Sequence, residues 1–252
     1  LAVTDASGTE VVFEKAPDRI VSITPSETEV LFAVGAGARV VGTDDWSDYP
    51  EEAAGLPKVG GFEMSVEAIL DLEPDLVVGV WSMSKAVIEE LRRLGVTVYA
   101  SDPLSLDDVI AHIRTVGAIM GCTDGAEETV GKMEEVRKIV AEAVGAIAEN
   151  EKRTVYVEFD QGWTVGKGTF IDELITEAGG INIAEGEGWF EINEESVIEA
   201  NPDVILYSAY VPGLEDVIRG RAGWDKMDAI EGGRIFAIDD NLYTRMGPRL
   251  GE

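Results

Sequence analysis

Apolar residues recur along the 252-residue chain with two different periods, and stretches of the two kinds alternate. Short runs rich in β-branched residues occur at 19–23, 39–43, 76–78 and 96–100, and stretches with apolar residues three and four apart lie between them. The first kind of run is typical of buried strands and the second of amphipathic helices. Because strand and helix alternate four times in the first half, the pattern predicts a parallel, doubly wound α/β lobe.

Two segments, 67–78 and 195–206, carry the same pattern. In each, a Glu stands seven residues before a Pro-Asp pair, a short amphipathic helix fills the gap, and a run of β-branched or Leu residues follows. Proline cannot continue a helix and disfavours the αR region for the residue before it, so each segment is predicted to be helix, sharp stop and buried strand. The repetition suggests two similar lobes. Because such a connection is common in α/β proteins, a coincidental match is the alternative.

Residues 124–149 separate the two segments and contain neither a proline nor a strand-like run. We predict one long helix here, with a buried face and a charged face, that joins two lobes as a stiff connector rather than a flexible linker. The predicted boundaries are an N-terminal lobe at 1–122, a connecting helix at 123–150 and a C-terminal lobe at 151–252. The apolar positions of the helix are Val130, Met133, Val136, Ile139, Val140, Val144 and Ile147.

Acidic residues outnumber basic ones by 49 to 20, which gives a formal charge of −29. Such a surface repels nucleic acid and anionic membranes, so neither is an expected partner, and it suits a protein that works in high salt or outside a cell. The single cysteine, Cys122, excludes an intrachain disulfide and a multi-cysteine metal site. No apolar run approaches the roughly 18 residues of a membrane-spanning helix. The chain begins at Leu1 without a signal-like segment, so we expect a mature form whose export signal has been removed.

Motifs of enzyme active sites are mostly absent. The glycine-rich stretch 162–168 resembles a phosphate-binding loop but has three residues instead of four between its glycines, and Gly stands where Ser or Thr should bind magnesium. The glycines at 35–37 end a predicted helix rather than follow a strand, unlike those of a dinucleotide-binding site. His112, the only histidine, is expected to be a surface or half-buried structural residue. Acidic clusters at 44–48 and 239–240 lack the spacing of calcium loops, so we predict neither catalysis nor a metal site.

Aromatic residues follow strands, on loops, instead of completing the apolar faces of helices. In open α/β sheets the loops beyond the carboxyl ends of the strands line the ligand crevice. The rings are therefore predicted to face a shared cleft between the lobes and to suit a large, flat, partly apolar ligand. For any single ring, a role in covering the edge of a lobe is an equal alternative. The set consists of Trp46, Tyr49, Phe62, Trp81, Trp163, Trp189 and Tyr243.

The motifs at 19–26, 35–42 and 48–50 and the two Glu-to-Pro-Asp segments follow one another along essentially the whole chain. In this order they resemble the substrate-binding proteins of ABC importers for cobalamin and ferric siderophores. The resemblance implies an α/β fold of two Rossmann-like lobes with mainly parallel central sheets, bridged by a single long α-helix. It also implies a ligand held in the cleft between the lobes, delivery of that ligand to a membrane permease, and no enzymatic activity.

The stretches 47–50 and 245–249 look most like the cobalamin-binding members of this family. By that resemblance, aromatic rings pack on the corrin and its lower base, and Asp240 or Asn241 bonds an amide side group. Phe62 stands where a Trp is often found, and the Asp of the last loop is displaced by one position, so these two contacts depart from the family pattern. The candidate ligand-binding residues are Trp46, Tyr49, Phe62, Trp81, Trp163, Trp189, Asp240, Asn241, Tyr243 and Arg245.

In this family a Glu on each lobe pairs with arginines of the permease, and Glu67 and Glu195 occupy the matching positions. The resemblance therefore implies the permease and its ATPase as partners, with cobalamin as a transported ligand and not a cofactor. We expect an extracytoplasmic monomer, periplasmic or lipid-anchored at the outer face of the membrane. The family continues into a terminal helix beyond the position of Glu252, and the sequence leaves open whether the C-terminus is truncated.

Alternatives remain for the ligand and for the class of protein. A ferric siderophore or haem is the second choice of ligand, because binders of these chelates direct Arg or Lys at an anionic ligand or supply an axial Tyr or His. The candidate cleft loops carry only Arg245 and Lys167 as cations and more acid than base, which favours a near-neutral ligand rimmed by amides. An enzyme on the same two-lobe fold and a sensor domain of a signalling receptor are the alternatives from other classes.

Overall fold

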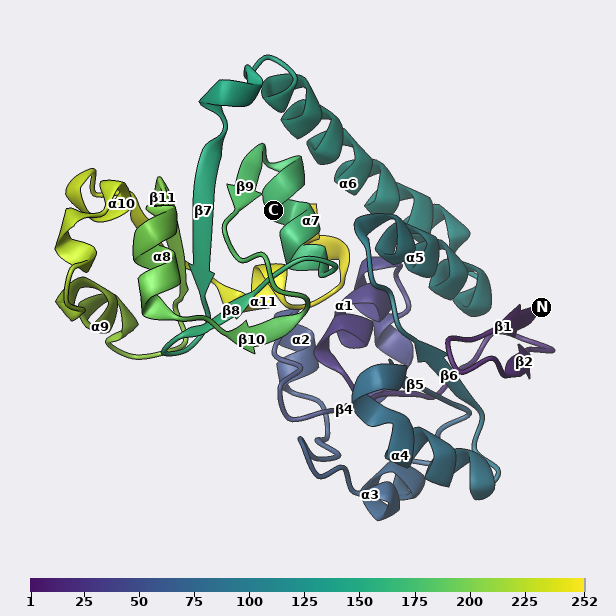
Figure 1. Cartoon of the computed structure of the whole chain (residues 1–252). Coiled ribbons are helices and arrows are strands. Elements are labelled where there is room, and N and C mark those ends of the chain that lie inside the picture. The colour runs from purple at the N-terminus through teal and green to yellow at the C-terminus, as the bar shows by residue number, and fades with distance from the viewer. Residues whose placement is uncertain (252) are drawn as a thin grey trace. The chain divides into compact units, whose positions relative to one another are not determined.

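The structure is a computed structural model that describes residues 1–251, and the chain folds into two compact units. The first lobe consists of residues 1–134 together with 245–251, and the second lobe consists of residues 135–244. Each lobe contains a four-stranded parallel sheet with helices on its faces (Figure 1). The predicted fold class, two Rossmann-like lobes with mainly parallel sheets, is confirmed.

The sheet of the first lobe has the strand order β4-β3-β5-β6, and all its neighbours are parallel. An antiparallel hairpin of β1 and β2 precedes it, as the turn residues between them predict. The strands are β1 (Ala2–Thr4), β2 (Glu10–Val12), β3 (Ile20–Ser22), β4 (Val40–Thr43), β5 (Leu76–Val80) and β6 (Val98–Ser101). The helices are α1 (Pro25–Ala33), α2 (Glu51–Ala54), α3 (Val66–Asp71), α4 (Trp81–Arg93), α5 (Leu106–Met120) and the 3-10 turns η1 (Gly37–Arg39) and η4 (Pro248–Gly251).

Consecutive residues of the central strands point into two separate cores. Ile20 and Leu76 pack with α1 and α5, whereas Val21 and Val77 pack with α3 and α4. This division follows from the period of two in a strand, and a strand buried on both faces reads as a continuous apolar run rather than an alternating one. The lobe is thus a three-layer sandwich whose strand ends hold the loops.

The sheet of the second lobe has the strand order β12-β11-β7-β9, again parallel, and a separate antiparallel pair of β8 and β10. The strands are β7 (Arg153–Glu158), β8 (Trp163–Val165), β9 (Gly180–Asn182), β10 (Trp189–Glu191), β11 (Val204–Ser208) and β12 (Ile235–Ile238). The helices are α7 (Phe170–Glu177), α8 (Glu194–Ala200), α9 (Leu214–Gly220), α10 (Asp228–Glu231), α11 (Asp240–Tyr243) and the 3-10 turns η2 (Glu149–Glu151) and η3 (Trp224–Lys226). Trp224 is wholly buried in this lobe, so it has a structural role.

The two Glu-to-Pro-Asp segments form α3–β5 in one lobe and α8–β11 in the other. The residues before the two prolines, Glu73 and Asn201, adopt φ of 47° and 45°, so both helices stop in the left-handed region where proline disfavours αR. The Asp after each proline accepts backbone hydrogen bonds from the start of the neighbouring strand. Asp75 accepts from the N–H of Arg19 at 2.9 Å, and Asp203 accepts from the N–H of Thr154 at 3.0 Å. Each segment therefore ends a helix, starts a strand and fixes that strand to its neighbour.

The connecting helix α6 (Thr123–Val144) carries the chain from the first lobe into the second and is shorter than the 26 residues expected from its pattern at 124–149. It ends just before Gly145, and glycine costs about 1 kcal/mol relative to alanine in a helix. Its early apolar residues Val130 and Met133 are buried, whereas Ile139 is exposed, so packing supports the beginning of the helix more than its end. The chain then returns to the first lobe at Arg245, a return that the boundary 151–252 did not include. In the described part of the chain, no helix has the length and apolar character needed to span a bilayer.

Candidate functional site

The predicted aromatic residues lie in loops and short elements that follow the parallel strands. The loop after β4 carries Trp46 and Tyr49, Trp81 follows β5 directly, and Trp163 comes shortly after β7. Tyr243 lies in α11, which follows β12. Because the carboxyl ends of parallel strands meet at one edge of a sheet, each lobe presents its own set of rings along one edge.

A buried polar network fixes the start of the loop after β4. Asp44 is wholly buried, and its carboxylate accepts hydrogen bonds from the backbone N–H of Trp46 at 3.0 Å and from the hydroxyl of Ser47. Burial raises the pKa of the Asp44 carboxyl above its usual value, although these hydrogen bonds oppose the shift. The ammonium group of Lys58 donates to the carbonyl of Ser47 at 2.7 Å. The base of this loop is therefore rigid, while its aromatic residues reach solvent.

Three rings form the exposed aromatic surface of the first lobe. Phe62 is 98% exposed, and Trp46 and Tyr49 are 43% and 45% exposed. Trp46 and Phe62 meet edge to face, with 4.6 Å between ring centroids. Gly61 permits this arrangement, because a Cβ there would come within 2.8 Å of the Trp46 ring. An almost fully exposed phenylalanine beside an exposed tryptophan is unusual on a protein surface, so these rings form the candidate binding surface of this lobe.

Trp81 differs from these rings because it is only half-exposed and packs against the core shared by α3 and α4. The ammonium of Lys85 lies 5.3 Å from its ring centroid, and the hydroxyl of Ser82 donates to Asp102 at 2.6 Å. Met83, in the same first turn of α4, is exposed. The sequence pattern did not single out Met83, because methionine carries no aromatic signal, but its place directly after a buried strand gives it the same position as the rings.

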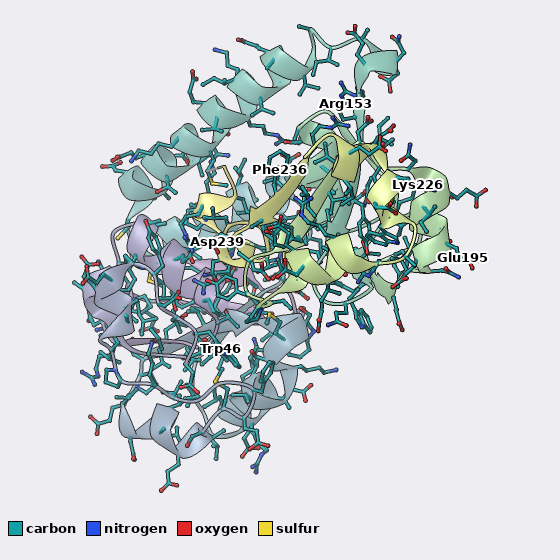
Figure 2. The ribbon with its side chains drawn as sticks, turned by 90° about the vertical axis from the view of Figure 1, so that its left-hand side faces the viewer. Trp46, Arg153, Glu195, Lys226, Phe236 and Asp239 are labelled. Carbon is teal, nitrogen blue, oxygen red and sulfur yellow. The ribbon has the colours of Figure 1, made fainter. Side chains whose placement is uncertain are left out.

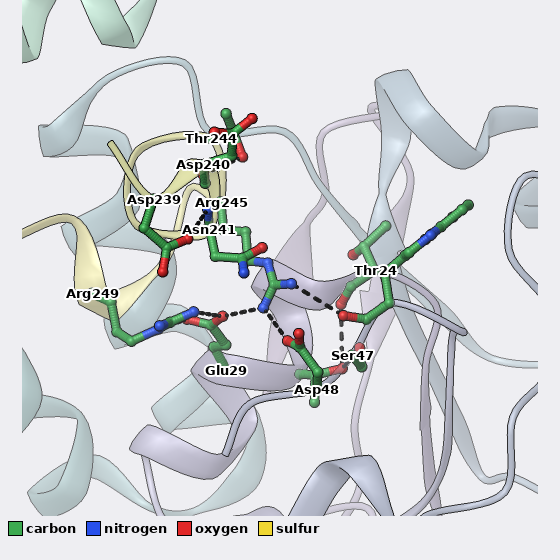
Figure 3. A network of polar contacts seen from close by, with 12 residues as sticks. Thr24, Glu29, Ser47, Asp48, Asp239, Asp240, Asn241, Thr244, Arg245 and Arg249 are labelled. Carbon is green, nitrogen blue, oxygen red and sulfur yellow. Dashed lines mark hydrogen bonds and ion pairs between the residues drawn. The ribbon is translucent and has the colours of Figure 1, made fainter. Parts of the chain in front are cut away.

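Arg245 was predicted to contact the ligand, and its side chain is only 10% exposed. Its guanidinium donates to Glu29 at 2.9 Å, to Asp48 at 2.8 Å and to the carbonyl of Trp46 at 3.1 Å (Figure 3). Burial opposes the charge of Arg245, but the two carboxylates outweigh it, so its pKa is raised. The guanidinium of Arg245 is thus already paired with α1 and with the loop that carries Trp46 and Tyr49.

The aromatic surface of the second lobe centres on the antiparallel pair β8 and β10. Trp163 and Trp189 stand on these two strands and are 47% and 49% exposed. Phe159, which the sequence prediction missed, packs against Trp189 at 4.4 Å and against Tyr243 at 5.4 Å between centroids. Its position directly after β7 is the feature of the sequence from which its place among the rings could have been predicted. Phe159 thus packs between Trp189 and Tyr243, two residues that are distant from it in sequence.

The polar residues Asp240 and Asn241 of α11 form hydrogen bonds with other residues of the second lobe. Asp240 accepts hydrogen bonds from the hydroxyl of Ser208 at 2.7 Å and from that of Tyr243 at 2.8 Å. Burial, followed by the charge and hydrogen bond of Asp240, raises the pKa of the Tyr243 hydroxyl. Asn241 donates through its amide to the hydroxyl of Tyr210, a residue outside the list of candidate ligand-binding residues although it follows the strand of the second repeated segment. Asp240 therefore orients Tyr243, while Asn241 and the exposed Tyr210 present amide and hydroxyl groups.

Glu67 and Glu195 occupy equivalent positions in the first turns of α3 and α8. Both side chains are exposed, and neither forms an ion pair with another described residue. Side-chain caps fix the two helix starts: Ser65 accepts from the N–H of Ala68, and Asn193 accepts from the N–H of Glu195. Figure 2 shows Glu195 projecting from the surface of the second lobe. Each glutamate is thus held on a fixed helix start, with its carboxylate available to a partner.

His112 was expected to be a surface or half-buried residue, and the structure shows it buried on α5. Its Nε2 lies 2.9 Å from the carboxylate of Glu27. The hydroxyl of Ser101 donates to the same carboxylate at 2.5 Å. Burial opposes the charge on Glu27, but His112 and these hydrogen bonds outweigh it, so the pKa of Glu27 is lowered. The residues described by the structure include no group of three or more His, Cys, Asp and Glu side chains placed to hold a metal.

Comparisons with known proteins agree with this architecture. A family model described as periplasmic binding protein matches residues 20–242. An uncharacterized ABC transporter substrate-binding lipoprotein of Bacillus subtilis, YvrC, is 32% identical over 100% of this chain and 82% of its own length. A cobalamin-binding protein of Halobacterium salinarum is 27% identical over 98% of this chain and 70% of its own length. The structure of the periplasmic heme-binding protein RhuT from Roseiflexus sp. RS-1 has 30% sequence identity and a TM-score of 0.83, and the match covers 93% of this chain and 94% of that one.

Proposed function

Because the chain belongs to the periplasmic binding protein family of ABC importers, we propose that it captures a corrinoid outside the membrane and hands it to a permease. The family comprises transport proteins for vitamin B12, haem and iron siderophores, not enzymes. Cobalamin is the corrinoid that we assign, as in the cobalamin-binding relative. The protein works as a monomer on the extracytoplasmic side, anchored by lipid like its lipoprotein relative or free in the periplasm.

The observation that carries this proposal is the set of exposed rings along the strand-end edge of each lobe. Phe62 and Trp46 in the first lobe, and Trp163 and Trp189 in the second, expose large apolar area without forming part of a core. A corrin is a broad, partly apolar macrocycle, and its burial against such rings recovers about 25 cal/mol for each Å² of apolar surface removed from water. The side-chain amide nitrogen of Asn241 donates to Tyr210, and the side-chain carbonyl oxygen of Asn241 is an acceptor suited to the amide side chains at the corrin rim.

The charges near the rings favour a near-neutral ligand over an anionic chelate. Arg245 and Arg249 both pair with Glu29, and Arg245 also pairs with Asp48. Lys167 and Lys85, the latter beside Trp81, are exposed, but two lysines offer little against an overall charge of −29. An anionic siderophore would therefore meet repulsion from the protein as a whole and few available cations at the rings.

Haem is the second candidate, because the likeness to RhuT is close and two tyrosines lie at the rings. Tyr49 and Tyr210 are both exposed, and a tyrosine oxygen can serve as an axial ligand to haem iron. The hydroxyl of Tyr210 already accepts a hydrogen bond from Asn241, and Arg249 covers one face of the Tyr49 ring at 4.0 Å from its centroid. We therefore propose haem as the second candidate, after cobalamin.

A ligand panel read by tryptophan fluorescence and visible absorbance distinguishes the candidates. Cyanocobalamin, haem and one ferric hydroxamate siderophore are titrated separately into the protein at matched salt. We expect quenching by cyanocobalamin that saturates at one equivalent, and weak or unsaturable changes with the other two. Tight binding of haem with a shifted Soret band, and no response to cyanocobalamin, would reverse the assignment.

Glu67 and Glu195 are the docking residues of this proposal. Their equivalent places on helix starts of two lobes present two carboxylates to arginines of a permease, in the manner of the family. Exposed carboxylates steer association and set orientation more than they add raw affinity. Docking through them is therefore a property of the transport step, not of ligand binding.

A further inference from the structure

Glu29 is a buried carboxylate that binds two arginines from the C-terminal segment. Its side chain is 1% exposed and stands on α1, whose neighbouring residues Val30 and Leu31 are wholly buried in the core of the first lobe. Arg245 donates to Glu29 at 2.9 Å, and Arg249 donates through Nε at 2.8 Å and Nη2 at 2.6 Å. A buried carboxylate is tolerated only when it is paired and hydrogen-bonded, so Glu29 requires both arginines.

Both arginines also contact the loop that bears the exposed rings. Arg245 donates to the carboxylate of Asp48 at 2.8 Å and to the backbone carbonyl of Trp46 at 3.1 Å. Arg249 places its guanidinium 4.0 Å from the centroid of the Tyr49 ring. Figure 3 shows Glu29 between the two guanidinium groups, with Asp48 on the other side of Arg245. The two arginines therefore join α1 to residues 46–49.

Other contacts hold the inner residues of the loop, Asp44 and Ser47, whereas the two arginines contact its outer residues. Asp44 and Ser47 bond each other in the interior, and the hydroxyl of Thr28 on α1 lies 2.7 Å from that of Ser47. Among the described residues, Asp48 forms its only ion pair with Arg245. One face of the Tyr49 ring is covered by the guanidinium of Arg249, so the ring's remaining exposed area is presented in a defined direction.

We propose that Glu29, Arg245 and Arg249 form a positioning clamp that holds Trp46 and Tyr49 in the arrangement that receives the ligand. This inference rests on the proposed function, and it assigns Arg245 to positioning the rings, in place of contacting the ligand. The clamp raises affinity because the loop is ordered before the ligand arrives, so binding does not have to order it. It also links residues 245–249, which follow α11 closely in the sequence, to the ring-bearing loop of the first lobe.

The clamp is tested in Arg249→Gln and Arg245→Gln, with Arg114→Gln as a matched control. Arg114 also pairs with glutamates in the first lobe, but it is exposed and contacts neither α1 nor the ring-bearing loop. The protein is labelled with 5-fluorotryptophan, and the fluorine resonances are assigned by single Trp→Phe substitutions. Ligand-free spectra report the environment of Trp46 with Trp163 of the second lobe as an internal reference, and cyanocobalamin affinity is measured on unlabelled protein.

In both clamp variants we expect the Trp46 resonance to shift and broaden while the Trp163 resonance stays in place. The affinity for cyanocobalamin should fall roughly 5- to 100-fold, which corresponds to ordering two side chains on binding. Arg249→Lys keeps the charge beside Glu29 but not the planar stacking on Tyr49, so its affinity should lie between those of the unaltered protein and Arg249→Gln. Arg114→Gln should match the unaltered protein in both measurements.

An unchanged Trp46 resonance together with unchanged affinity in both clamp variants would overturn the clamp. Should either Gln variant fail to fold, Arg249→Lys decides the matter by the same two readouts, and identity with the unaltered protein counts against the clamp. Lack of cyanocobalamin binding by the unaltered protein would instead refute the proposed function. The ligand-free Trp46 spectrum still tests the clamp in that case, so the two failures are distinguishable.

Discussion

Replacing Phe62 by alanine separates ligand binding from folding, because this side chain is 98% exposed in the free protein. Its only aromatic neighbour among the described residues is Trp46, itself 43% exposed. Truncation therefore removes almost no buried surface from the folded state. We expect the free energy of unfolding to change by no more than about 0.5 kcal/mol, the range of ordinary surface substitutions.

The effect on binding should be much larger if Phe62 packs on the ligand. Full burial of a phenylalanine side chain is worth about 1.5–3 kcal/mol, and each 1.4 kcal/mol changes a dissociation constant by about tenfold. The affinity of Phe62→Ala for cyanocobalamin should accordingly fall about 10- to 100-fold. Calorimetric titration measures the affinity, and urea unfolding followed by circular dichroism measures the stability.

Phe236→Ala is the matched control, since Phe236 is an exposed phenylalanine in the middle of β12 and not at a strand end (Figure 2). Its removal should leave the affinity unchanged. Equal affinities for Phe62→Ala and the unaltered protein would refute the assignment of Phe62 to the ligand surface. A large loss of stability in Phe62→Ala would show that its exposure in the free protein is not as described.

Three further variants test other parts of the account. Trp224→Ala should lower the free energy of unfolding by about 3–5 kcal/mol and leave the affinity of the remaining folded protein unchanged, because Trp224 is wholly buried away from the rings. Burial opposes the ionisation of Asp5, but hydrogen bonds and the charge of Arg92 outweigh it and lower its pKa. The stability that Asp5 contributes is thus present above its unfolded pKa of about 3.9 and is lost as the pH falls through its lower folded pKa. The melting temperature of Asp5→Asn should therefore depend less on pH below about 4 than that of the unaltered protein. Glu67→Ala with Glu195→Ala should reduce uptake in a reconstituted importer while the affinity in solution stays the same, and a large loss of affinity would contradict the docking role.

The repeated segments could be predicted from the sequence because their structure is set locally. The prolines after Glu73 and Asn201 stop both helices by steric contact with the adjacent residue, and nothing distant is needed for that outcome. Buried strands such as β5 were equally clear, since a run that is apolar at every position fits a strand covered on both faces. Local sterics and burial therefore account for most of the fold class.

The clamp could not be predicted in the same way, because it joins residues that are far apart in the chain. Arg245 and Glu29 are separated by 216 positions, and nothing near either residue in the sequence indicates the other. The sequence showed an arginine on a loop beside predicted ring residues, which is the ordinary appearance of a ligand contact. Only the return of the chain to the first lobe brings Arg245 and Arg249 onto α1.

The candidate rings were all predicted to lie on loops, which is correct for Trp46, Tyr49 and Phe62. The prediction is wrong for the other four, which lie in helices or strands: Trp81, Trp163, Trp189 and Tyr243. Trp81 packs partly against a core, whereas Phe62, which directly follows the pair Gly60 and Gly61, is almost fully exposed. Phe159 was missed although it follows β7 directly, because its neighbours Trp189 and Tyr243 come from other elements. Residue type and position after a strand gave the candidates, and tertiary contacts decided which rings remain available.

Calorimetric titration of the unaltered protein with cyanocobalamin tests the central claim most directly. The account predicts saturable binding of one cyanocobalamin per chain with a dissociation constant below about 1 μM, equivalent to more than about 8 kcal/mol of binding free energy. It also predicts a negative heat-capacity change, because the exposed rings are buried on binding. Absence of any saturable heat with cyanocobalamin at about 100 μM, in a preparation shown to be folded, would contradict the assignment of a corrinoid as the transported ligand.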